Sequence, residues 1–293
     1  MLDLLQITFF FEGYTMSNST YPKAKSLLFV SSIKPENFMP SFESEADAII
    51  LDLEDSVPSE RKDEGRANVL RFCRDNVQYK FFVRVNDAQS PFFADDMKFL
   101  LELGLDKLHG VMLAKTEQKA HIESVINALG EIPLLLLIES ALGVQNLPIT
   151  ASQPCAKQLA FGAFDMILDL GLRDGEGKDF MLNYVRTQMA LASRINNLLP
   201  PINRVFPNTR DESRLKTNME LAYSMGFGGS LTFYPNQLAI INAIFTQGNN
   251  QIEWAKEILR LVELHKGETF SFEGNVVDIP MIKKAQGILE RKY

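Results

Sequence analysis

The sequence predicts an α/β fold, a (β/α)8 TIM barrel that carries a C-terminal helical extension, and two observations point to it. Eight short apolar runs of strand-like composition alternate with longer segments of helical periodicity. Several of these runs are continuously apolar rather than alternately apolar and polar, as expected for parallel strands buried on both faces. The alternative is a doubly wound open sheet, but the glycines of residues 171–177 lack the spacing of its phosphate-binding fingerprint.

The expected strands follow one another from residue 26 onward. They cover residues 26–32, 47–55, 80–86, 110–115, 133–140, 157–165, 202–208 and 228–234. Helices are expected between them at residues 59–75, 97–103, 116–129 and 180–199. Ser59 is suited to cap the first of these helices, Gly104 and Gly130 to end the next two, and Pro200 to stop the last.

Two further parts flank the barrel, which we expect to span residues 25–250. Residues 1–24 are predicted to be a disordered tail, because their short apolar stretch lacks the basic residues and cleavage site of a signal peptide. Residues 251–293 exceed what eight βα units require and contain a helix, an irregular segment and a closing helix. We interpret this segment as an extension that covers a site.

Composition excludes several classes of protein. The chain of 293 residues has 30 Lys and Arg against 37 Asp and Glu, a net charge of −7, which argues against nucleic-acid binding. Its longest apolar run falls far short of the ~20 residues of a membrane span. Two cysteines cannot form a disulfide framework and favour a reducing, cytoplasmic location. The three histidines lack zinc-ligand spacing, so any metal would be held by oxygen atoms, as Mg²⁺ or Mn²⁺ are.

Charged side chains end several consecutive strands, at the edge where barrel enzymes place their active sites. Glu139 and Asp165 follow two neighbouring apolar strands. Two carboxylates, together with waters and a chelating substrate, suit an octahedral Mg²⁺ site, although either carboxylate could instead pair with a cation such as Lys115.

Arg84 is the best candidate to bind an anion, because its planar guanidinium can hold a carboxylate through two hydrogen bonds. Asp52 and Glu54 at the end of the preceding strand could orient it through internal ion pairs. We expect Asp52, Glu54 and Lys115 to lie behind the residues that contact the substrate.

At these residues the sequence resembles the HpcH/HpaI aldolase/citrate lyase beta-subunit family, in particular its acyl-CoA lyases of the citramalyl- and malyl-CoA type. The segments that carry the resemblance are ADAIILDLEDSVPSERKDEGR (46–66), VRVN (83–86), GVMLAK (110–115), LLLIESALGV (135–144), LAFGAFDMILDLG (159–171), GFGGSLTFYPNQLAIIN (226–242) and GNVVDIP (274–280).

The resemblance implies a (β/α)8 barrel assembled as a homotrimer or a dimer of trimers. It implies Mg²⁺ on Glu139 and Asp165, and a substrate-carboxylate clamp at Arg84. It also implies that Asp278 is the general acid/base and reaches a neighbouring subunit's site. The expected reaction is Mg²⁺-dependent cleavage of citramalyl-CoA, malyl-CoA or citryl-CoA to acetyl-CoA and a 2-oxo acid, with Glu139 and Lys34 also contacting substrate.

The chain departs from the family pattern around the expected coenzyme A entrance. The loop after the first strand reads SSIKPENF, with Asn37 in place of an arginine; Tyr234 replaces the usual histidine before Pro235, and Phe206 and Asn208 replace a tyrosine and an aspartate. These changes leave two alternatives open: a class II aldolase of free 2-oxo acids, and a non-catalytic homologous subunit.

Overall fold

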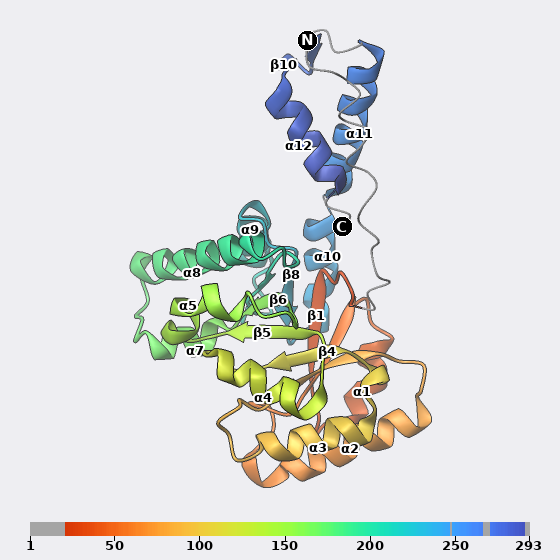
Figure 1. Ribbon diagram of the computed structural model, residues 1–293, viewed down its shortest axis with the longest axis vertical. Helices are drawn as coiled ribbons and strands as arrows, with labels where there is room; N and C mark the ends of the chain where they lie inside the picture. Colours follow the sequence, from red (N-terminus) through yellow and green to blue (C-terminus); the bar gives the residue numbers. More distant parts are fainter. Residues whose placement is uncertain (1–20, 247, 266–269, 291–293) are drawn as a thin grey trace.

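The computed structural model describes residues 21–246, 248–265 and 270–290 and contains a closed barrel of eight parallel strands with helices outside it (Figure 1). Each strand pairs with its successor in the chain, and β8 closes the barrel against β1. The predicted (β/α)8 fold is confirmed. Of the expected N-terminal tail, residues 1–20 lie outside the described residues. No helix in the described ranges has the length and apolar character needed to cross a membrane.

The strands of the barrel are short. They are β1 (Ser26–Ser31), β2 (Ala48–Asp52), β3 (Phe81–Val85), β4 (Leu108–Leu113), β5 (Leu134–Ile138), β6 (Ala156–Phe161), β7 (Ile202–Asn203) and β8 (Gly229–Thr232). The surrounding helices are α1 (Phe38–Phe42), α2 (Lys62–Asp75), α3 (Phe93–Leu103), α4 (Lys119–Leu129), α5 (Ala141–Gln145), α6 (Leu147–Thr150), α7 (Ala163–Asp169), α8 (Glu176–Ile195), α9 (Glu212–Ser224) and α10 (Leu238–Thr246).

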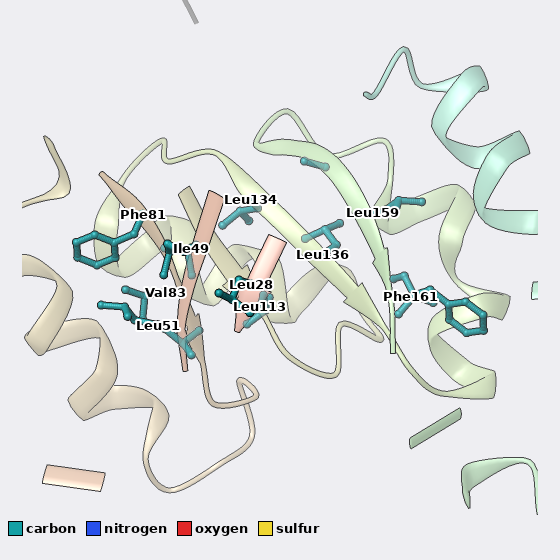
Figure 2. Packing of buried hydrophobic residues seen from close by; sticks show 14 of the residues in the cluster. Leu28, Ile49, Leu51, Phe81, Val83, Leu113, Leu134, Leu136, Leu159 and Phe161 are labelled. Atoms are coloured by element: carbon teal, nitrogen blue, oxygen red, sulfur yellow. The ribbon is translucent and has the colours of Figure 1, made fainter. Parts of the chain in front are cut away.

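Two apolar cores explain why the strands are continuously apolar. In β5, Leu134, Leu136 and Ile138 belong to the core between the barrel and its helices, where Figure 2 shows Leu134 and Leu136 among their neighbours. Leu135 and Leu137 point the opposite way, into the core that fills the barrel itself. Alternate residues of a strand face opposite sides of the sheet, so a strand with both sides covered needs apolar residues at every position.

Seven of the eight strands are shorter than the runs expected for them, and two of these, β6 and β7, are informative. The run at 157–165 forms strand only as far as Phe161, and α7 begins at Ala163, so the prediction that Asp165 ends a strand was wrong. The run at 202–208 pairs only at Ile202 and Asn203. Pro207 lacks an N–H group for a sheet hydrogen bond, and Ser230 Oγ donates to the Arg204 carbonyl oxygen at 3.0 Å in place of a backbone partner.

The C-terminal elements form a unit with its own small core. It comprises α11 (Gly248–Leu264), β9 (Phe270–Phe272), β10 (Asn275–Val277) and α12 (Ile279–Glu290). Ala255, Ile258, Ala285 and Ile288 are buried within it, separately from the two barrel cores. In Figure 1 the unit projects away from the barrel beyond α10.

Candidate active site

A cavity opens at the carboxyl ends of the strands. It is lined by Phe29, Asp55, Arg84, Leu137, Glu139, Phe161, Gly162, Ala163, Phe164, Asp165, Val205, Leu231 and Phe233. The cavity thus brings together Glu139, Asp165 and Arg84, which three different parts of the chain contribute. Most of its other lining residues are apolar, which is typical of a ligand site with a few polar groups.

Glu139 follows β5 and is almost completely buried, with 4% of its surface exposed. Its Oε1 accepts a hydrogen bond from the Lys115 backbone N–H at 2.7 Å. Burial raises the pKa of the Glu139 carboxyl to about 8, and the nearby negative charge of Asp165 acts in the same direction. A buried carboxylate beside a second carboxylate favours the binding of a cation.

Asp165 lies in the first turn of α7 and is half-buried. In the described part of the chain, its carboxylate has no hydrogen-bond or ion-pair partner. Gly162 precedes the helix and lies against Glu139: a Cβ at this position would come within 2.5 Å of the Glu139 Cβ. A glycine is therefore required here for the Glu139 side chain to occupy its place.

Arg84 is buried at the end of β3 and is surrounded by acidic groups. Its Nε and Nη2 donate to the two carboxylate oxygens of Asp52, each at 2.7 Å. Its Nη1 lies 3.0 Å from Glu54 Oε2 and 3.5 Å from Asp55 Oδ2, and its Cζ lies 4.7 Å from the ring centroid of Phe29. A guanidinium has five N–H groups, and four of them point to these carboxylates. One N–H of Nη2 therefore has no acceptor in these contacts.

The same ion pairs determine the charge state of the arginine and of Asp52. Burial would lower the pKa of Arg84, but Asp52 and Glu54 outweigh it and raise the pKa above the usual range. Burial would raise the pKa of Asp52, but Arg84 outweighs it and holds the pKa below the ordinary value. Both groups are therefore charged at neutral pH.

Glu54 links Arg84 to Lys115. Its Oε1 lies 3.0 Å from the Lys115 ammonium, and its Oε2 contacts Arg84. Lys115 adopts a left-handed backbone with φ of 46°, which directs its N–H toward Glu139 while its side chain reaches Glu54. Asp52, Glu54 and Lys115 lie outside the cavity lining, next to the residues that form it.

Asp278 and Lys34 do not line the cavity of their own chain. Asp278 is exposed at the start of α12, where its Oδ1 accepts from the Met281 backbone N–H at 2.9 Å. Lys34 is exposed in the loop between β1 and α1. The structure of one chain therefore assembles Arg84, Glu139 and Asp165 but leaves these two residues apart.

Sequence reasoning missed three contributors to this region. Gly162 carries no signal beyond being a glycine between a strand and a helix. Phe29 lies in the middle of an apolar strand run and could not be told from a core residue. Lys62 is buried and donates to the Leu53 and Glu54 carbonyl oxygens at 2.7 and 2.8 Å, and to Asn86 Oδ1 at 2.6 Å.

The donor set of Glu139 and Asp165 fits Mg²⁺. Both offer carboxylate oxygens, which hard cations prefer, and Glu139 is buried without a cationic side chain in hydrogen-bond contact. No cluster of three or more His, Cys, Asp or Glu side chains suited to a metal occurs among the described residues. Because Mg²⁺ commonly uses one or two carboxylates and keeps several waters, two protein ligands are sufficient.

Comparison with known proteins confirms the resemblance found in the sequence. Residues 25–235 match the HpcH/HpaI aldolase/citrate lyase family. The chain is 30% identical over 281 residues to a citrate lyase subunit beta-like protein of Deinococcus radiodurans, a match that covers 92% of this chain and 97% of that protein. It is 26% identical to the L-malyl-CoA/beta-methylmalyl-CoA lyase of Rhodobacter capsulatus, covering 94% and 98% of the two chains.

A solved structure agrees over nearly the whole fold. The protein CitE of Mycobacterium tuberculosis, in complex with magnesium, acetoacetate and coenzyme A, superposes with a TM-score of 0.74 at 25% sequence identity. The match covers 91% of this chain and 97% of that one. RipC of Yersinia pestis matches with a TM-score of 0.63 at 27% identity, over 77% and 96% of the two chains.

Proposed function

Because the chain belongs to the HpcH/HpaI aldolase/citrate lyase family and is a metal-dependent carbon–carbon lyase, we propose that it cleaves a 3-hydroxy-dicarboxylic or -tricarboxylic acyl-CoA. Candidate substrates are citramalyl-CoA, malyl-CoA and citryl-CoA, and the products are acetyl-CoA and a 2-oxo acid. The observation that carries this proposal is the convergence of Glu139, Asp165 and Arg84 on one cavity at the carboxyl ends of the strands.

In the proposed site Glu139 and Asp165 hold Mg²⁺. When bound, Mg²⁺ supplies a Lewis acid for the oxygen that becomes the ketone of the 2-oxo acid. The chain itself keeps the ligands in place: the Lys115 N–H fixes one oxygen of Glu139, and Gly162 leaves room for the side chain.

Arg84 is proposed to bind the carboxylate of the 2-oxo acid portion. Its remaining Nη2 hydrogen is the available donor, since Asp52, Glu54 and Asp55 occupy the other four N–H groups. These acidic partners lock the guanidinium in one orientation before substrate arrives, which reduces the cost of ordering the site.

Asp278 is proposed to protonate the carbon that becomes the methyl group of acetyl-CoA, in the site of a neighbouring subunit. Asp278 is exposed and lies on a unit that projects from its own barrel, and Val276 and Ile279 beside it are apolar and exposed. Exposed apolar side chains also occur on the barrel helices, at Phe164 of α7 in the cavity lining and at Phe180 of α8. Covering both sets in a homotrimer or hexamer would remove apolar surface from water.

The test is a mass-spectrometric screen of CoA thioesters with the purified protein and Mg²⁺. We expect release of acetyl-CoA and a 2-oxo acid from one of the three candidate thioesters, and loss of this activity in Asp165→Asn. Asp106→Asn, which alters an exposed carboxylate, serves as the control and should keep full activity. Full activity in the presence of EDTA would contradict the proposed role of the metal.

The runner-up is an aldolase that uses free 2-oxo acids, which the altered loop around the exposed Lys34 and Asn37 favours. Incubation with acetyl-CoA and free pyruvate separates the two functions, because only the lyase condenses them. Carbon–carbon cleavage of a free hydroxy-oxo acid, with no reaction of any CoA thioester, would establish the aldolase instead.

A further inference from the structure

Two arginines, Arg186 on helix α8 and Arg204 directly after β7, are separate from the cavity residues Glu139 and Asp165. Arg186 is buried, with 2% of its surface exposed. Its Nε donates to Asn203 Oδ1 at 3.0 Å, its Nη1 donates to Asn183 Oδ1 at 2.7 Å, and its Cζ lies 5.6 Å from the Phe161 ring centroid. Its Nη2 has no hydrogen-bond partner in the described structure.

Arg204 directly follows Asn203, which accepts the hydrogen bond from Arg186 Nε, and it contributes a second guanidinium with an unused donor. Its Nη1 makes a long contact of 3.5 Å with the Val205 carbonyl oxygen, and its buried Nε has no partner among the described residues. The charge of Arg204 is close enough to add to the effect of burial on Arg186, and the two together lower the pKa of Arg186 to about 10. A guanidinium keeps its proton at neutral pH, so both arginines are charged and repel each other.

No carboxylate within the described residues forms an ion pair with either arginine. Asp179 attracts both charges from the first turn of α8, but it is exposed and not in contact with them. The polar partners of Arg186 are neutral amides, which satisfy hydrogen bonds without compensating charge. Burying unpaired charges is unfavourable, so two guanidinium groups with unused buried donors favour a negatively charged ligand.

We propose that Arg186 and Arg204 form a binding site for a small oxyanion, a carboxylate or phosphate group that accepts hydrogen bonds from Arg186 Nη2 and Arg204 Nε. Guanidinium groups are well suited to both kinds of anion. Arg204 is only partly buried, whereas Arg186 is almost completely buried. The site adjoins the catalytic cavity, because Phe161 and Val205 line that cavity and also contact the two arginines. The proposal does not depend on the lyase reaction.

The first experiment titrates inorganic phosphate and, separately, acetate into the full-length protein by isothermal titration calorimetry at constant ionic strength. We expect saturable binding of at least one anion, and the tighter of the two identifies the preferred group. Arg204→Gln should weaken this binding by about tenfold or more, because it removes a charged hydrogen-bond donor. Arg214→Gln removes the same charge from an exposed position and should leave the affinity unchanged. Absence of saturable binding, or equal affinity in Arg204→Gln and wild type, would overturn the proposal.

A second variant tests the charge argument without removing an arginine. Asn203→Asp places a carboxylate 3.0 Å from Arg186 Nε with little change of shape, and Asn218, now 3.2 Å from Asn203, can turn its amide toward the new group. This internal anion should raise the melting temperature and abolish the response to phosphate and acetate. An unaltered response to both anions would show that the arginines do not form their binding site.

Discussion

Gly162→Ala tests whether the position of Glu139 determines metal binding. The new Cβ would lie 2.5 Å from the Glu139 Cβ, whereas ordinary contacts are 3.4 Å or longer, so one of the two groups must move by about 0.9 Å (3.4 − 2.5). Such overpacking typically costs about 1–3 kcal/mol of stability. A displacement of about 1 Å in a catalytic group can reduce turnover by about a hundredfold.

The assay combines urea unfolding, Mg²⁺ titration by calorimetry and turnover of the substrate identified in the screen. Gly177→Ala is the matched control, because a Cβ at Gly177 in the first turn of α8 meets nothing within 4 Å. We expect Gly162→Ala to lose Mg²⁺ affinity and turnover while Gly177→Ala keeps both. A folded Gly162→Ala protein with wild-type affinity and turnover would refute the reasoning.

Three further predictions concern the charged groups. Arg84→Lys should lose most turnover and also about 1.5–3 kcal/mol of stability, measured by urea unfolding, because a lysine cannot reproduce both hydrogen bonds to Asp52; unchanged stability would show that these bonds contribute little. The stability advantage of wild type over Asp52→Asn should be fully present above about pH 4 and shrink as the pH falls through the depressed pKa of Asp52, and a pH-independent difference would contradict this. Mixed oligomers of Asp278→Ala and Asp165→Ala chains should regain activity if Asp278 acts in a neighbouring site, whereas inactive, proven hetero-oligomers would show that it does not.

The sequence was sufficient to predict the barrel because its signal is repeated in every strand. A run such as Leu134–Ile138 has apolar residues at each position, and the two cores on either side of β5 account for all of them. The end of β6 could not be predicted, because the residues from Gly162 to Phe164 are as apolar as those of a strand and the first charged residue after them is Asp165. Helix α7 begins there because of tertiary packing, which the local pattern of apolar and polar residues does not indicate.

In the candidate site, too, some positions could be predicted from the sequence and others depend on tertiary structure. The positions of Arg84 and Glu139 follow from strand ends, since parallel strands finish at one edge of the barrel. We expected Asp52 and Glu54 to form ion pairs with Arg84, and both do, whereas the contact of Arg84 with Asp55 depends on a side-chain direction that only the structure supplies. Glu273 and Gly274 both have positive φ and form the tight turn between β9 and β10, a detail that depends on the pairing of these two strands.

Asp278 caps the start of α12, and this cap limits where the chain can accept insertions or deletions without moving Asp278. The hydrogen bond from the Met281 N–H ties the carboxylate to the start of the helix, and α12 shares a core with α11. The orientation of the Asp278 carboxylate is therefore fixed relative to α11 and α12, which pack together as one unit. Helix α11 has 17 residues and a length of about 26 Å. One residue inserted into it would turn all that follows by about 100° and advance it by about 1.5 Å. Loops around the barrel can gain or lose residues without redirecting Asp278, whereas α11 acts as a spacer of fixed length.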